Sequence, residues 1–185
     1  MYIACCDALD KSYLCLNNTL QMLDFEIDKL TNSIEHALTN QVFQTQLVRV
    51  LSDARLNKKN WVFDWKLELS DPARRVYKLV TVAEPNLVHG LISIGFNEDH
   101  VYMHLLENAA FNKGHSKLYR GVAGNLVAFA CKSSFEHGFD GIVVFESKTS
   151  LIDHYKQTMG AKVLARNRLF IDTLEASMLV KRYFK

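Results

Sequence analysis

Residues 121–137 constrain the fold of this chain more than any other segment. They run for seventeen residues without proline, and Val122, Leu126 and Phe129 recur at the spacing of one helical face. A glycine follows this predicted helix, and the stretch 140–146 after it contains the apolar run Ile-Val-Val-Phe. An apolar strand directly after a helix is typical of a parallel crossover connection. We therefore expect one parallel junction in the sheet.

Short strand-like runs precede this helix and are separated by turn residues. We expect strands at 42–50, 61–69, 76–82, 87–96 and 101–107. Most of their connections have the length of a hairpin turn, which makes neighbouring strands antiparallel. Ser52 is a candidate cap for a brief helix through residue 59.

The chain continues with predicted elements after the parallel junction. These are a helix at 150–159, a hairpin at 161–165 and 168–172, and an amphipathic helix at 174–184. The pattern predicts an α+β, sandwich-like fold with a mixed, mostly antiparallel sheet, one parallel junction and flanking helices. The length of 185 residues suits one domain. We assign residues 1–20 to an N-terminal appendage and 21–185 to that domain.

Composition excludes some classes of protein. The 22 basic and 20 acidic residues leave a net charge of +2, which argues against nucleic acid as a partner. The four cysteines include no Cys-x-x-Cys pair, so we expect neither a metal site nor a disulfide framework. Cys131 falls within the predicted long helix and should behave as a small apolar residue. Neither a secretory signal nor an apolar run of 18 residues is present, so we expect a cytoplasmic protein with no membrane partner.

The segment 118–126 carries the most informative chemistry. It joins a strand to the long helix, and its glycines would let the backbone approach a ligand closely. The unpaired N–H groups and positive dipole of a helix start suit a pyrophosphate, and Arg120 adds charge there. The spacing fits neither a Walker loop nor a dinucleotide fingerprint. From the residues alone, the glycines either bind phosphate or only turn and pack the loop.

The order of elements over residues 76–172 resembles the GCN5-related N-acetyltransferase (GNAT) family. Its loop pattern, Arg/Gln-x-x-Gly-x-Gly/Ala, is matched here by Leu118-Tyr119-Arg120-Gly121-Val122-Ala123, in which the glycine and the alanine fit. Leu118 departs from the pattern, and Arg120 stands two places late. The resemblance implies acetyl-CoA as co-substrate, without a metal. The cofactor-binding residues it implies are Leu106, Asn108, Arg120, Gly121, Val122, Ala123, Gly124, Asn125 and Ser150.

The same resemblance implies the catalytic groups. Tyr155 precedes Gly160 on a helix, as the family's tyrosine precedes its glycine, and it would protonate the leaving thiolate. Glu107 lies near the end of a strand that splays from its parallel neighbour in the family, and it would deprotonate the amine. Strict alternation places Glu107 on one face with Met103, and His104, a competing base, on the other. Each residue also has a structural interpretation, in packing or solvation.

These observations predict an acyl-CoA-dependent N-acetyltransferase that moves an acetyl group from acetyl-CoA to a primary amine by direct attack. We expect the amine to belong to a small molecule or a peptide. The alternative is a non-catalytic module of the same fold that binds CoA or a protein partner. An acyltransferase acting on a small RNA or tRNA is a third hypothesis, which a basic surface beside the acceptor cleft would favour. Homodimers could form at the sheet edge or through the N-terminal residues.

Overall fold

The computed structural model describes residues 32–51 and 61–184. The predicted appendage at 1–20, the helix expected at 52–59 and the cysteines at positions 5, 6 and 15 lie outside the described residues. The described elements are β1 (Ser33–His36), β2 (Val42–Val50), α2 (Trp65–Ser70), β3 (Arg74–Thr81), β4 (Val88–Phe96), β5 (Val101–Asn108), η2 (Ala110–Asn112), β6 (Tyr119–Arg120), α3 (Val122–Glu136), β7 (Val143–Glu146), η3 (Thr149–Leu151), α4 (Ile152–Met159), β8 (Lys162–Ala165), β9 (Arg168–Ile171) and α5 (Thr173–Tyr183).

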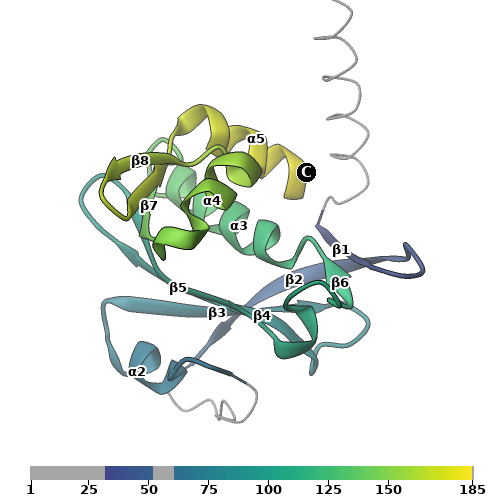
Figure 1. Cartoon of the computed structure of the whole chain (residues 1–185). Helices are drawn as coiled ribbons and strands as arrows, with labels where there is room; N and C mark the ends of the chain where they lie inside the picture. Colours follow the sequence, from purple (N-terminus) through teal and green to yellow (C-terminus); the bar gives the residue numbers. More distant parts are fainter. Residues whose placement is uncertain (1–31, 52–60, 185) are drawn as a thin grey trace, which may run out of the picture.

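Within these residues, nine strands form one sheet in the order β6-β1-β2-β3-β4-β5-β7-β9-β8 (Figure 1). The β5–β7 pair is parallel, and the other described ladders are antiparallel, which confirms the predicted junction. The parallel ladder runs from Val101 opposite Val143 to Met103 opposite Phe145. β5 continues to Asn108, so in the described chain its last residues have no ladder partner in β7. The two strands therefore part beyond Met103.

The helices divide between the two faces of the sheet. α3, α4 and α5 lie over one face, and α2 lies against the other (Figure 1). The larger core contains Leu126 of α3, Met159 of α4 and Leu179 of α5, packed on the sheet. Cys131 is fully buried there, and burial raises the pKa of its thiol to about 12. It is therefore a packing residue, as predicted.

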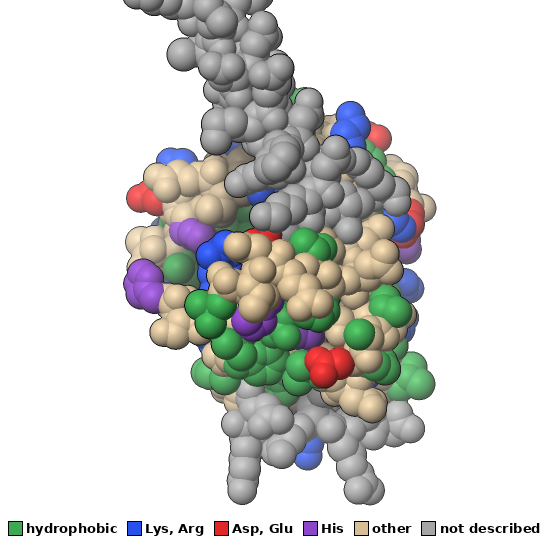
Figure 2. Space-filling model, turned by 90° about the vertical axis from the view of Figure 1, so that its right-hand side faces the viewer, with side chains coloured by type: hydrophobic (Ala, Val, Ile, Leu, Met, Phe, Trp, Pro, Cys, Tyr) green, Lys and Arg blue, Asp and Glu red, His purple; other side chains and the backbone are tan. Residues whose placement is uncertain are grey.

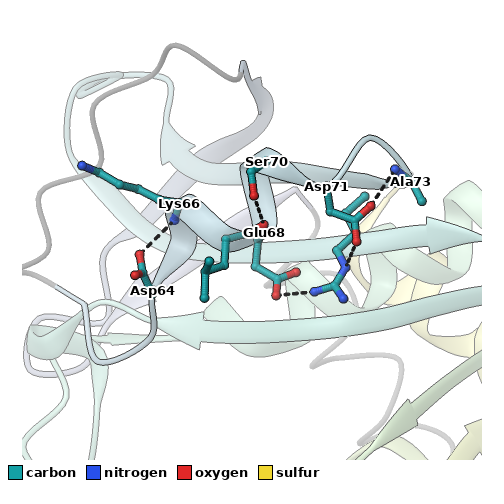
Figure 3. Close-up of polar contacts among 8 residues, drawn as sticks. Asp64, Lys66, Glu68, Ser70, Asp71 and Ala73 are labelled. Atoms are coloured by element: carbon teal, nitrogen blue, oxygen red, sulfur yellow. Dashed lines mark hydrogen bonds and ion pairs between the residues drawn. The ribbon is translucent and has the colours of Figure 1, made fainter.

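The strand predicted at 61–69 is wrong, because residues 61–64 lie outside any strand and the rest of the segment belongs to α2. The Asp64 carboxylate accepts a hydrogen bond from the Lys66 backbone N–H and caps the helix (Figure 3). Trp65 and Glu68, three residues apart, are the buried positions of α2, whereas Leu67 is exposed. The apolar residues of this segment alternate along the sequence as they would in a strand. Its buried positions, however, are spaced as in a helix. Arg74 forms ion pairs with Glu68 and with Asp71. Its Nη1 lies 2.6 Å from Glu68 Oε1, and its Nε lies 2.9 Å from Asp71 Oδ2.

A β-bulge in β5 changes which side chains face each core. Ser93 of β4 pairs with Leu105, and the next residue, Ile94, pairs with Met103, so His104 is the extra residue. Before the bulge, Met103 packs in the α3 core. After it, Leu106 faces that core, while Leu105 packs with Trp65 on the α2 side. The predicted alternation, which put Met103 and Glu107 on one face, is therefore wrong beyond His104.

The end of the sheet formed by β1, β2 and β6 carries exposed hydrophobic side chains. Figure 2 looks onto the side of the molecule that contains this end, and hydrophobic side chains gather on the lower half of that view. The exposed hydrophobic residues of this end include Leu38 in the turn between β1 and β2, and Val42 and Val48 of β2. β1 and β6 were not predicted; β6 has two residues and pairs with β1.

In the described part of the chain, no helix is long and apolar enough to span a membrane.

Candidate active site

A cavity of about 350 Å³ lies where α3 begins, between α4, α5 and the loop that follows β5. Residues from four parts of the chain line it, far apart in the sequence. They are Asn108, Asn112, Lys117, Tyr119, Gly121, Val122, Ala123, Gly124, His154, Gln157, Thr158, Met159, Leu179, Arg182 and Tyr183. The volume is at the lower end of the range for small-molecule sites and would hold part of a large cofactor.

The predicted glycine segment forms one wall of this cavity. Gly121 is the N-cap of α3 with a φ of 85°, a left-handed conformation that glycine adopts without a Cβ penalty. No side chain of the described residues caps α3, and Val122, Ala123 and Gly124 of its first turn line the cavity. The unpaired amides and the positive dipole of the helix start favour an anion there.

Two other residues expected to bind the cofactor have structural partners instead. Arg120 donates to Glu35 Oε1 and to the Ala37 carbonyl oxygen, at 3.4 and 3.2 Å, and does not line the cavity. The short β6–β1 ladder fixes it beside β1. Asn125 is fully buried, and its Nδ2 donates to the Ser33 carbonyl oxygen at 2.8 Å. These contacts connect α3 and β6 to β1.

The remaining predicted cofactor residues differ in placement. Asn108, at the end of β5, lines the cavity, and its buried Oδ1 has no hydrogen-bond partner among the described residues. Leu106 is half-buried in the α3 core and does not line the cavity. Ser150 is exposed in η3 and caps no helix, because α4 begins after Leu151. Of these three, only Asn108 offers a polar atom to a ligand in the cavity.

Tyr155 lies on α4 close to the point where β5 and β7 part. Its ring makes an edge contact with Phe145, the last residue of the parallel ladder, at a centroid distance of 5.2 Å. Burial raises the pKa of Tyr155 above its ordinary value, so the phenol stays protonated at neutral pH. The hydroxyl makes no hydrogen bond to any residue of the described ranges. This group can donate a proton.

Glu107 is almost fully buried on the α2 side, and four donors hold its carboxylate. These are the Val62 and Phe63 backbone N–H groups at 2.8 and 3.3 Å, Trp65 Nε1 at 2.8 Å and Lys113 Nζ at 2.6 Å. Burial alone raises the pKa of Glu107, but these hydrogen bonds, Lys113 foremost, bring it below 4.5. A carboxylate stabilised in this way is a weak base. Glu107 therefore links the segment before α2 to the loop after β5 by hydrogen bonds. We call Glu107 and its four donors the brace.

His104, the bulge residue, is the other predicted base. Its ring is next to Tyr102, at a centroid distance of 4.8 Å. A Cβ at Gly95 would come within 2.7 Å of His104 Nε2, so glycine on β4 makes room for the imidazole. Desolvation and the charge of Arg74 lower the pKa of His104, which keeps the ring neutral near pH 7. A neutral imidazole can accept a proton.

Sequence reasoning missed most of the cavity lining outside the glycine segment. In the sequence, Lys117 stands with Lys113 and His115 in a loop whose basic residues either contact an adenosine 3′-phosphate or are simply solvated. The sequence around Arg182 and His154 has no ligand-binding pattern. The only signal in the sequence was the spacing of Leu179, Arg182 and Tyr183, which places them on one face of α5. That pattern alone does not distinguish a packing face from a binding face.

The strand order, the parallel junction and the flanking helices define a GNAT-like fold, as predicted. No protein-family model and no curated protein matches the sequence. Similar solved structures include a mutant AtaT toxin bound to the C-terminus of the antitoxin AtaR and acetyl-CoA, with 17% identity and a TM-score of 0.53, covering 73% of this chain and 97% of that one. Another is AtaT complexed with acetyl-methionyl-tRNAfMet, with 15% identity and a TM-score of 0.52, covering 74% and 99%. At these identities the likeness shows the fold alone.

The expectation that nucleic acid is an unlikely partner is wrong. The similar structures include AtaT with a tRNA and a KacTA–DNA complex; the latter has 14% identity and a TM-score of 0.52, and covers 74% of this chain and 98% of that one. Net charge is an average over the whole surface, so an even balance does not describe any one region. The cavity illustrates this, because its lining in the described ranges includes Lys117 and Arg182 and no acidic residue.

Proposed function

We propose that this chain is an acetyl-CoA-dependent N-acetyltransferase that transfers the acetyl group to a primary amine. The observation that carries the proposal is the cavity at the uncapped start of α3, beside the point where β5 parts from β7. The amides of Val122, Ala123 and Gly124 would bind the CoA diphosphate there. Asn108 Oδ1 would accept a hydrogen bond from an amide of the pantetheine arm.

Direct transfer would use the gap between the two parallel strands. The amine nitrogen attacks the thioester carbonyl carbon, the C–N bond forms and the C–S bond breaks. Tyr155 donates its proton to the departing sulfur. On its side toward β7, the β5 backbone beyond Met103 would supply N–H groups that polarise the carbonyl oxygen. Holding the two substrates side by side in this gap would supply much of the acceleration.

Of the two candidate bases, the geometry favours His104. The four donors on Glu107 stabilise its carboxylate and leave little driving force for accepting a proton. His104 lies on the sheet face that carries α2, opposite the face with α3 and the cofactor cavity. There it could take the ammonium proton directly or through a water. Glu107 would then position the residues before α2, which border the same face.

The acceptor screen should include amines carried by tRNA beside free amines. AtaT has been solved with acetyl-methionyl-tRNAfMet, and this chain has a similar fold. The described residues of α2 and its flanks carry both acidic and basic side chains, including Asp64, Lys66 and Arg74. This mixed surface does not select one acceptor class, so polyamines, peptide N-termini and aminoacyl-tRNA all belong in the screen.

Thermal unfolding with and without acetyl-CoA tests the cofactor site first. Ligand at about 100 times its dissociation constant should stabilise the fold by about 2.7 kcal/mol, a rise in Tm of roughly 5–10 °C. Release of free CoA thiol in the presence of each amine then tests transfer. No shift at millimolar acetyl-CoA would refute the proposal. A clear shift without turnover on any acceptor would favour the non-catalytic CoA-binding alternative, to which the departures at Leu118 and Arg120 also point.

A further inference from the structure

The charge of the α3 cavity is one-sided. Among the described residues, its lining contains Lys117, Arg182 and His154 but no aspartate or glutamate. The lysine comes from the loop after β5, the arginine from α5 and the histidine from α4. Together with the helix start, these groups make the cavity attractive to a ligand that carries several negative charges. CoA, with a diphosphate and a 3′-phosphate, is such a ligand.

Arg120, the basic residue of the glycine segment, does not line this cavity. Arg120 is held against β1 by Glu35 and by the Ala37 carbonyl oxygen. Leu118 stands where the motif has arginine or glutamine, and it is exposed outside the lining. A phosphate ligand in this cavity must therefore find its cationic partners elsewhere. In the part of the chain that the structure describes, Arg182 and Lys117 are the two permanently charged side chains that line it.

Close packing between α5 and α3 fixes the position of Arg182. The next residue, Tyr183, is buried, and a Cβ on Gly124 would lie only 2.1 Å from its hydroxyl oxygen. Glycine at position 124 is therefore needed for α5 to approach the first turn of α3. The Tyr183 carbonyl oxygen also accepts from the Asn32 backbone N–H at 2.8 Å. Arg182 lies with its guanidinium carbon 5.6 Å from the Tyr183 ring centroid, which restricts its orientation.

We propose that α5 is part of the cofactor site, and that Arg182, assisted by Lys117, binds the phosphate groups of CoA in place of the basic residue missing from the loop motif. This inference rests on the proposed function. A guanidinium forms charge-assisted hydrogen bonds with phosphate oxygens, and its fork can contact two oxygens at once. α5 would then contact the CoA phosphates from the side opposite the start of α3. The two helices can pack this closely because residue 124 is glycine.

Arg182→Gln tests the inference, with Lys181→Gln as the matched control. Lys181 is the preceding residue on α5, and it is exposed and outside the cavity lining. Affinities for CoA, dephospho-CoA and pantetheine, which carries no phosphate, are measured by calorimetry on each full-length variant. Removing a hydrogen-bonded charge should weaken CoA binding about 10- to 100-fold in Arg182→Gln and leave Lys181→Gln unchanged. Arg182→Lys should recover part of the loss, and pantetheine should bind all variants alike.

The comparison of ligands separates the outcomes. A loss in Arg182→Gln that persists with dephospho-CoA supports the inference and assigns Arg182 to the diphosphate; a loss that disappears supports it and assigns Arg182 to the 3′-phosphate. Unchanged CoA affinity overturns the inference alone, as does an equal loss for pantetheine, which would mean a structural defect. If the unaltered chain binds no CoA, the proposed function falls and this inference with it.

Discussion

Glu107→Gln separates a structural brace from a general base. The buried carboxylate accepts hydrogen bonds from two backbone N–H groups, the Trp65 indole and the Lys113 ammonium. Glutamine has one acceptor oxygen, and its amide nitrogen would face groups that are themselves donors. Each buried donor left without an acceptor costs about 1–3 kcal/mol. With one or two donors lost, we expect a destabilisation of about 3 kcal/mol.

That loss should be measurable by calorimetry or thermal unfolding monitored by circular dichroism. For a chain of this size, about 1 kcal/mol corresponds to roughly 2–4 °C in Tm, so the variant should melt about 6–12 °C lower. Lys113→Met, which removes one of the four donors, is the graded control and should cost less. A Glu107→Gln protein with unchanged Tm and abolished turnover would refute the brace and restore Glu107 as the base.

The pH dependence of stability gives a second readout of the same group. The hydrogen bonds hold the pKa of Glu107 below 4.5 in the folded state. In the unfolded chain the carboxylate would have its ordinary pKa. The stabilisation is therefore complete above about pH 4.5 and is lost as the pH falls through the lower, folded-state pKa. Glu107→Gln should lack this acid-induced loss.

Three further predictions concern other sites. Tyr155→Phe should keep acetyl-CoA binding but lower kcat about 10²–10⁴-fold, and an unchanged kcat would remove Tyr155 from the mechanism. Burial lowers the pKa of His89 from 6.5 to about 4. As the pH falls from 6.5 to 4, the unfolded chain takes up a proton that the folded chain does not, so the free energy of unfolding should fall by up to about 3 kcal/mol. In His89→Gln, stability measured by chemical denaturation should depend less on pH over this range. The same pH dependence as in the unaltered chain would show that His89 does not cause it. Gly124→Ala should destabilise by about 1–3 kcal/mol through contact with Tyr183, although alanine favours helices; a higher Tm would contradict the close packing.

The sequence predicted those elements whose local pattern and tertiary environment agree. α3 and β7 were found because a long apolar helix face and a fully buried strand have few other interpretations. α2 was misassigned because Trp61, Trp65 and Leu69 fall at positions that fit both a strand and a helix. Only the cap at Asp64 and the burial of Glu68 against β3 distinguish the two. β6 is too short for any periodic signal, and it exists because β1 pairs with it.

The candidate site was predictable where one segment carries it and not where several segments meet. Gly121 through Gly124 form a local turn-and-helix signal, and the structure places them in the cavity. Lys117 and Arg182 lie far apart in the sequence, and they line one cavity only because α5 packs against α3. No local pattern contains that information. Arg120 shows the converse, because its position beside the glycines suggested phosphate binding, while a strand pairing directs it elsewhere.

One extra residue explains why Glu107 lies on a different face of the sheet from the one that strict alternation predicts. Without the bulge, Glu107 would follow the alternation of Met103 and face the α3 core, where neither Trp65 nor the segment before α2 could reach it. His104 takes up one position without a partner on β4, so every later side chain of β5 turns to the opposite face. That inversion brings Glu107 to the donors before α2 and leaves His104 at the point where β5 departs from β7. Removing His104 by deletion should therefore disturb both groups, whereas His104→Gln should keep the bulge and the brace and lower only turnover. An unchanged kcat in His104→Gln, with unchanged Tm, would exclude the imidazole as the base.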